Sequence, residues 1–189
     1  LTKTKFQSLV FLTLSSLFFA VALLVKPYAI FFSLPFIYLI AINVGVLPYH
    51  LYILPIFAAI SVAPLLLWRQ WILQYPAGIP ASDWLYNTNG IRFRPAWFRW
   101  LFAERLSKLI LGYWGTAPFI FGLICKYKNK AENSYILWFI GIVLYFSIFA
   151  GGNVTHDYYQ SITMPFIAMI LAKGFSSFSG IKSKIALLV

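Results

Sequence analysis

The chain of 189 residues is 61% hydrophobic and only 10% charged, and its mean hydropathy is +0.82. Soluble domains carry about 25% charged residues, so this composition excludes a soluble enzyme, a disordered tail and a DNA-binding domain. It predicts a protein whose solvent is lipid. A net charge of +11 is typical of membrane proteins with basic cytoplasmic loops and contacts to anionic headgroups.

Six apolar runs match the roughly 20 residues that a helix needs to cross the hydrocarbon core of a bilayer. They are 7–25, 28–46, 51–68, 107–125, 134–151 and 161–179. We therefore predict an all-α, polytopic integral membrane protein with about six transmembrane helices, and a single transmembrane domain over 1–189. Several prolines in the second and third runs predict kinks, which neighbouring helices can accommodate; these are Pro35, Pro48, Pro55 and Pro64.

Lysines in the short loops predict the orientation, because cytoplasmic loops carry the excess of positive charge. Lysine clusters lie before the first run, at 126–130 and at 173–184. With an even number of spans, all three clusters fall on one side, which we assign to the cytoplasm. Lys26, the loop 69–108 and the turn 152–160 are then extracytoplasmic.

The loop 69–108 departs from this charge rule. It contains six Lys and Arg residues against two acidic ones, and with Trp68 it holds five of the seven tryptophans. Tryptophan prefers the headgroup level, and the planar fork of arginine suits phosphate. The arginines therefore meet either ordinary lipid phosphates or one specific anion, and their clustering with tryptophan favours the specific anion. Nucleic acid is a poor partner for a surface tied to a bilayer.

Residues 95–108 within this loop predict an interfacial helix. Pro95 suits the first helical position, and Glu104 and Lys108 have the favourable i,i+4 spacing. The separation of polar from apolar residues around this helix is incomplete.

A second polar segment, 151–160, follows the fifth run. Gly151-Gly152 permits a tight turn or a close approach of another backbone. His156 and Asp157 suit metal binding, proton transfer or hydrogen bonding to a sugar. Tyr158 and Tyr159 suit stacking on a ring or anchoring at the interface. A polar turn with interfacial tyrosines explains the same four residues.

Three segments together resemble the C-terminal half of the GT-C superfamily of membrane glycosyltransferases. The closest members are bacterial relatives of the dolichyl-phosphate-mannose protein mannosyltransferases and the aminoarabinose transferases. The segments are Leu23-Leu24-Val25-Lys26-Pro27, the Arg-Trp-Leu-Phe-Ala-Glu-Arg-Leu run at 99–106, and His156-Asp157-Tyr158-Tyr159-Gln160 with Met164-Pro165.

The resemblance implies an enzyme of the cytoplasmic (inner) membrane that takes a sugar from a polyprenyl-phosphate donor. Transfer to a lipid, glycan or protein acceptor takes place on the extracytoplasmic side. The pool of expected donor-phosphate ligands is Lys26, Arg92, Arg94, Arg99 and Arg105, and the expected sugar or acceptor region is His156, Asp157, Tyr158 and Tyr159. A divalent metal is the one candidate cofactor, with His156 and Asp157 as its candidate ligands.

The catalytic acid of this family usually lies in the first extracytoplasmic loop. None of Asp83, Glu104, Glu132 and Asp157 lies in such a loop. We therefore expect the chain, which begins at Leu1, to be a fragment that lacks the general base and is inactive alone. The rival class is a transporter or flippase without transferase activity. The scarcity of charge inside the spans disfavours a transporter, whereas the prolines favour it.

Overall fold

The computed structural model describes residues 3–43, 50–79 and 83–186, and every regular element in these ranges is a helix. The predicted all-α class is therefore confirmed. The chain divides into two compact units, Leu1–Ala81 and Ser82–Val189, and the division falls inside the loop predicted at 69–108. Each unit is described by itself, and the single transmembrane domain stays a prediction.

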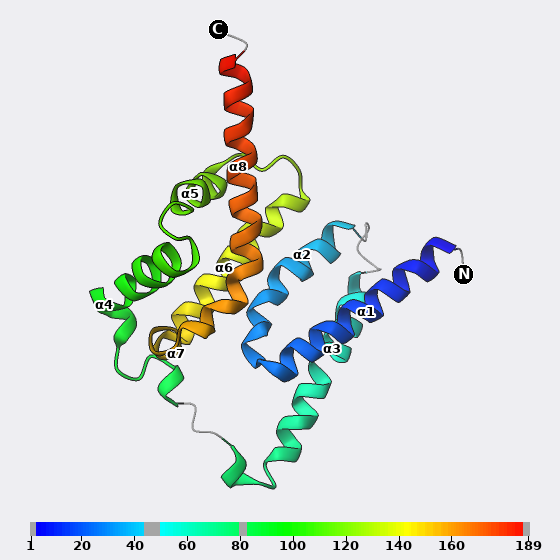
Figure 1. Ribbon diagram of the computed structural model, residues 1–189. Coiled ribbons are helices and arrows are strands. Elements are labelled where there is room, and N and C mark those ends of the chain that lie inside the picture. The colour runs from blue at the N-terminus through cyan, green and yellow to red at the C-terminus, as the bar shows by residue number, and fades with distance from the viewer. Residues whose placement is uncertain (1–2, 44–49, 80–82, 187–189) are drawn as a thin grey trace. The chain divides into compact units, whose positions relative to one another are not determined.

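The first unit is a helix pair with a shorter helix beside it (Figure 1). Helix α1 (Lys3–Val25) packs along α3 (His50–Ile72), and a 3-10 turn, Pro27–Phe32, leads from α1 into α2 (Ser33–Asn43). The hydroxyl of Ser61 on α3 donates to the carbonyl oxygen of Ser16 on α1 at 3.2 Å, and both residues are buried. Small hydroxyl residues that join two helices in this way are typical of membrane proteins.

The first three apolar runs correspond to these helices. Helix α3 continues through both Pro55 and Pro64. The kink predicted at Pro48 lies outside the described residues.

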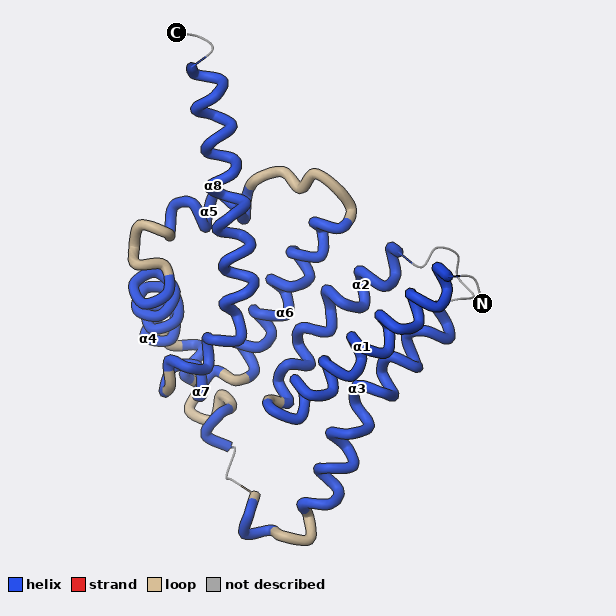
Figure 2. The backbone as a smooth tube through the Cα atoms, turned by 45° about the vertical axis from the view of Figure 1, so that its right-hand side comes forward, coloured by secondary structure: helices blue, strands red, loops and turns tan. Residues whose placement is uncertain are grey.

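The second unit contains the remaining helices (Figure 2). Short 3-10 turns at Asp83–Leu85 and Ile91–Phe93 lead into α4 (Pro95–Phe98), which continues as a π-helical segment, Arg99–Ile110. After these come α5 (Thr116–Ile124), α6 (Ser134–Ile148), α7 (Ala150–Thr155), a 3-10 helix (Asp157–Thr163) and α8 (Met164–Ala186).

Helices α5 and α8 form the closest helix pair of this unit (Figure 1). A Cβ atom added to Gly122 on α5 would collide with the carbonyl oxygen of Ile170. A Cβ atom added to Gly174 on α8 would collide with that of Pro118. The two backbones thus touch because neither glycine has a side chain, as at small-residue contacts between membrane helices.

The prediction of one transmembrane helix over 107–125 is wrong. The π-helical segment ends at Ile110, and α5 begins only at Thr116. Between them, Gly112 and Tyr113 have φ angles of 55° and 60°, a left-handed conformation that ends a helix. Nine residues of α5 rise about 14 Å, less than half of a hydrocarbon core of about 30 Å.

The predicted turn at 152–160 is also wrong in form, because α7 and the 3-10 helix Asp157–Thr163 make most of this segment helical. Among the described residues, two helices are long and apolar enough to cross a membrane, Tyr52–Ile72 and Ala131–Ile148. Leu9–Val25 and Pro27–Ile42 are shorter apolar helices. The count of six spans stays a prediction.

Candidate functional site

The two glycines at the start of α7 allow another backbone to lie directly against this helix. The amide of Gly151 donates to the carbonyl oxygen of Tyr86 at 3.3 Å. A Cβ atom on Gly151 would collide with the carbonyl oxygen of Trp84, and one on Gly152 would press on the side chain of Leu85. The predicted close backbone approach is confirmed, and it brings the segment 83–86 to the polar residues after α7.

An aromatic cluster results at this position. The ring of Trp84 meets the imidazole of His156 edge-on at 5.4 Å between centroids. The imidazole stacks on Tyr158 at 5.2 Å and on Tyr159 at 5.9 Å. Tyr158 is exposed, whereas Tyr159 is buried and accepts a hydrogen bond from the hydroxyl of Tyr145 at its carbonyl oxygen, at 3.1 Å. Tyr158 is therefore the tyrosine open to a ligand, and Tyr159 anchors the segment.

Two buried amide side chains hold the ends of this segment together. The Nε2 of Gln160 donates to the main-chain oxygen of Asn153 at 2.7 Å and to its Oδ1 at 3.1 Å. Asn153 in turn donates to the carbonyl oxygen of Phe149 at 3.0 Å. Sequence reasoning did not assign a role to these amides. Their signal was an Asn and a Gln beside apolar helices, where a buried polar group requires a partner.

The π-helical segment arranges its charged and aromatic residues at i,i+5 spacing. The guanidinium of Arg99 lies 3.7 Å from the carboxylate of Glu104, and that of Arg105 lies over the ring of Trp100 at 5.4 Å. The predicted i,i+4 pair is confirmed, with Lys108 Nζ 3.4 Å from Glu104 Oε2. Pro95 opens α4 as predicted. The interfacial location of this helix stays a prediction.

One ion pair joins the two polar segments. A guanidinium nitrogen of Arg105 lies 3.8 Å from Asp157 Oδ2, and the side chains are 18% and 58% exposed. The Nε atom of Arg105 is buried and has no hydrogen-bond partner among the described residues. The ion pair uses one terminal nitrogen, and a guanidinium carries five N–H donors, so this side chain is suited to a second anion through its other terminal nitrogen.

The other predicted phosphate ligands differ in their engagement. Arg92 donates from Nη1 to the carbonyl oxygen of Ser147 at 3.0 Å, near the end of α6, where cations are favourable. Arg94 is exposed, and its side chain makes no ion pair or hydrogen bond within the described ranges. Lys26 belongs to the first unit, where its ammonium lies over the ring of Tyr28 at 5.5 Å. The structure therefore pairs Arg105 with Asp157 and Arg99 with Glu104. Lys26 belongs to the other unit.

The proposed metal pair gains no further protein ligand. No three His, Cys, Asp or Glu side chains come together in the part of the chain that the structure describes. His156 lies among aromatic rings, and Asp157 faces Arg105.

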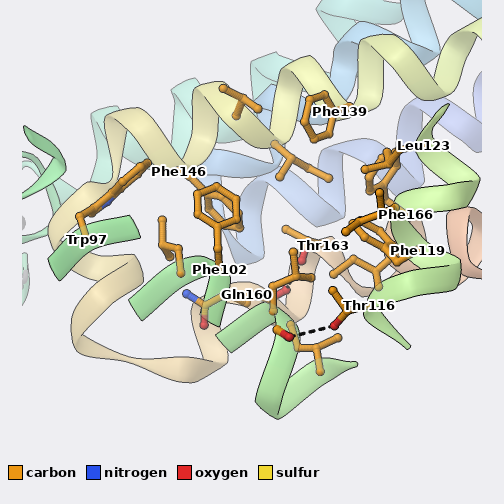
Figure 3. Close-up of a pocket in the computed structure, with 18 residues that line it drawn as sticks. Trp97, Phe102, Thr116, Phe119, Leu123, Phe139, Phe146, Gln160, Thr163 and Phe166 are labelled. Carbon is orange, nitrogen blue, oxygen red and sulfur yellow. Dashed lines mark hydrogen bonds between the residues drawn. The ribbon is translucent and has the colours of Figure 1, made fainter. Parts of the chain in front are cut away.

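A cavity of about 330 Å³ lies beside the π-helical segment (Figure 3). Its wall is formed by α4 and the π-helical segment that continues it, by α5 and α6, and by the 3-10 helix Asp157–Thr163 with the start of α8; none of its 18 lining residues is charged. The hydroxyls of Ser107 and Thr116 hydrogen-bond each other at 2.8 Å. These two polar groups of the wall are therefore engaged with each other rather than with a ligand. Sequence reasoning missed this cavity because its lining residues come from six elements spread over 97–167.

Comparison with known proteins adds no relative: no family model, no curated protein and no solved structure matches this chain.

Proposed function

We propose that this chain is a membrane glycosyltransferase of the GT-C type that moves a sugar from a polyprenyl-phosphate donor to an acceptor on the extracytoplasmic side. The ion pair between Arg105 and Asp157 carries the proposal. It connects two segments, 99–106 and 156–160, that the sequence indicated for different reasons. One supplies cations for a phosphate, and the other supplies rings and polar groups for a sugar.

The donor phosphate is assigned to Arg94, Arg99 and Arg105, with Lys26 as a further candidate. Arg94 is exposed without a side-chain partner among the described residues, and the ion pair of Arg105 with Asp157 uses only one of its terminal nitrogens. Arg92 is a weaker ligand, because the carbonyl oxygen of Ser147 already occupies one of its nitrogens. The acceptor and sugar are assigned to the surface around Tyr158 and His156, where exposed rings offer stacking area.

In the proposed reaction the acceptor hydroxyl attacks the anomeric carbon of the donor. A carbon–oxygen bond forms to the acceptor while the bond to the phosphate oxygen breaks, and a carboxylate takes the hydroxyl proton. The arginines stabilise the charge that grows on the departing polyprenyl phosphate. No residue is assigned as the base, since Glu104 and Asp157 face cations and Glu132 accepts from the amide of Lys128.

The proposed membrane topology has six crossings, with the N-terminus in the cytoplasm. Exposed apolar side chains along α1 and α3 and the glycine contacts of α5 and α8 support a lipid environment. In this topology the fourth crossing is not a single helix, because α5 alone is too short. The end of the π-helical segment and α5 make it together, with the break at Gly112 and Tyr113 between them. The variant Asn129→Cys in a Cys125→Ser background tests whether the loop between α5 and α6 faces the cytoplasm. Labelling by an impermeant maleimide only after the membrane is opened supports this topology. Labelling of intact cells refutes it.

Binding of a short donor analogue tests the phosphate site. Geranylgeranyl phosphate is titrated into the reconstituted chain and into its Arg94→Ala, Arg99→Ala and Arg105→Ala variants. Each lost charge-assisted hydrogen bond is worth about 1.5–3 kcal/mol, so Arg105→Ala is expected to weaken binding by about tenfold or more. Arg69→Ala is the matched control, because Arg69 is an exposed arginine that is not among the assigned phosphate ligands. Equal affinity in all four variants would refute the phosphate site.

A transporter or flippase is the second candidate, favoured by Pro55 and Pro64 inside α3. Prolines within the hydrophobic segments are typical of transporters, although α3 itself continues through both. Flux of lipid-linked sugar across vesicles without glycosyl transfer would support this class over the enzyme.

A further inference from the structure

The cavity of the second unit presents an almost wholly apolar wall. Its members include Leu101, Phe119, Ile142 and Phe166, and no lining residue is charged. The amide Nε2 of Gln160 points to Asn153 rather than to a ligand. A molecule that fills this space therefore contacts carbon, and a charged headgroup finds no counter-ion there.

The cavity is bordered by exposed apolar side chains. Phe102, Ile120, Phe139 and Val143 all line it, and they are between 42% and 52% exposed. They come from three different segments, the π-helical segment, α5 and α6. A ligand thus enters from an apolar surrounding, which in the proposed membrane setting is the hydrocarbon of the bilayer.

The size of the cavity limits its occupant. An apolar cavity of about 150 Å³ holds one benzene molecule, so 330 Å³ holds about a dozen carbon atoms on the same scale. An α-helix with its side chains is about 10–12 Å across and does not fit. The cavity is at the small end of ligand pockets, about 300–1,000 Å³, and suits a single hydrocarbon chain.

We infer that this cavity binds one fatty-acyl chain of a bilayer phospholipid. Trp97 stands at one end of the lining and Leu123 at the other (Figure 3). The charged headgroup of a phospholipid is separated from its acyl chain by the ester and the glycerol. The phosphate of a prenyl phosphate follows directly on the chain and brings a charge that no lining residue balances.

This inference rests on the membrane setting of the proposed function but not on glycosyl transfer. The acyl chain packs behind the π-helical segment, whose outer residues include Arg99 and Arg105. The bound lipid therefore supports the wall that carries the proposed phosphate ligands.

Photo-crosslinking tests the site. The chain is reconstituted in phosphatidylcholine vesicles with a trace of phospholipid that carries a diazirine in the middle of one acyl chain, irradiated, digested and mapped. Crosslinks are expected to concentrate in 101–110, 119–123 and 139–146. Val143→Trp fills the cavity from its rim and is expected to lower the yield in the first two peptides by about tenfold.

The matched control is Leu144→Trp, because Leu144 lies on the same helix with nearly the same exposure, 42% against 45% for Val143, and does not line the cavity. It is expected to leave the pattern unchanged. If Val143→Trp loses its unfolding transition, Ile120→Trp with Ile124→Trp as its control replaces the pair on α5.

Three results would overturn the acyl site. The first is an even spread of crosslinks over the exposed apolar residues. The second is an equal change of yield in both tryptophan variants. The third is displacement of the label by geranylgeranyl phosphate that is equimolar with the labelled phospholipid. The last result would give the cavity to a prenyl chain. If the crosslinks are retained but the chain does not bind prenyl phosphate, only the proposed function is refuted. If the chain binds prenyl phosphate but the crosslinks do not concentrate at the cavity, only the acyl site is refuted.

Discussion

The glycine contacts between α5 and α8 allow a sharp test of the second unit, since these helices form one wall of the cavity. We consider Gly122→Ala and Gly174→Ala. Each added Cβ atom would collide with a main-chain carbonyl oxygen, of Ile170 or of Pro118. A backbone oxygen cannot turn aside as a flexible side chain does, so the two helices must separate.

The expected cost follows from the rigidity of the contact. Overpacking costs typically about 1–3 kcal/mol, and backbone collisions belong at the upper end of that range. For a chain of this size, each kcal/mol lowers the unfolding temperature by about 2–4 °C. Each variant is therefore expected to unfold about 4–12 °C lower. The double variant should cost less than the sum, because the first alanine already separates the helices.

Thermal unfolding followed by far-UV circular dichroism in one detergent measures these shifts. Gly78→Ala is the control, because no atom lies within 4 Å of the Cβ position; its unfolding free energy should change by less than about 0.5 kcal/mol. Unchanged unfolding temperatures for Gly122→Ala and Gly174→Ala would refute the close approach. Strict additivity would refute the shared contact.

Three further predictions concern the same unit. Burial, followed by the charge of Glu132, raises the pKa of Tyr127 above its ordinary 10.0. The unfolded chain therefore loses this proton first as the pH rises, and the unfolding free energy should fall above about pH 10. Urea unfolding measured against pH checks this, because the fall should be less steep in Tyr127→Phe. Arg92→Met removes the hydrogen bond to Ser147 and should lower the unfolding free energy by about 1 kcal/mol. The affinity of the folded protein for geranylgeranyl phosphate should not change. A loss of affinity equal to that of the other arginine variants would show that Arg92 is a phosphate ligand. Deleting Ala103 spaces Trp97, Leu101, Leu106 and Ile110 four residues apart along the cavity face, so the π-helical segment can become α-helical. The unfolding temperature should then stay the same or rise. A drop of more than about 4 °C, the effect of roughly 1–2 kcal/mol, would contradict this.

Local features of the fold were predictable because neighbouring residues determine them. Pro95 opens α4, and Glu104 pairs with Lys108, as their positions along the helix require. Gly151 and Gly152 allow close backbone contact, although the sequence did not indicate that residues 83–86 supply the other backbone.

The break after Ile110 was missed for a physical reason. Hydropathy is nearly continuous over 107–125, and a window of that kind does not register backbone conformation. Gly112 and Gly115 were the available signal, since glycine readily adopts the left-handed conformation seen at Gly112. Tyr113 adopts it as well, which its residue type gave no reason to expect.

The composition of the candidate site depended on partners distant in sequence. Arg92 and Arg105 look alike as members of a basic loop, yet one donates to the carbonyl oxygen of Ser147 and the other faces Asp157. These partners lie about fifty residues further along the chain, and only the packing of α6 and α7 brings them near. Sequence reasoning therefore found the segments but could not distinguish the roles of their arginines.

The π-helical geometry explains how one short segment has both an apolar cavity face and a charged outer face. In an α-helix, the residues that follow Leu101 on its own face are Arg105 and Lys108. Placing them against the cavity would cost several kcal/mol per charge. The i→i+5 hydrogen bonds of the segment bring Leu106 and Ile110 to the cavity instead. Leu106 and Ile110 also follow Phe102 at four-residue spacing, so what the π-helix adds is a cavity face on which Leu101 is followed by apolar residues rather than by Arg105 and Lys108.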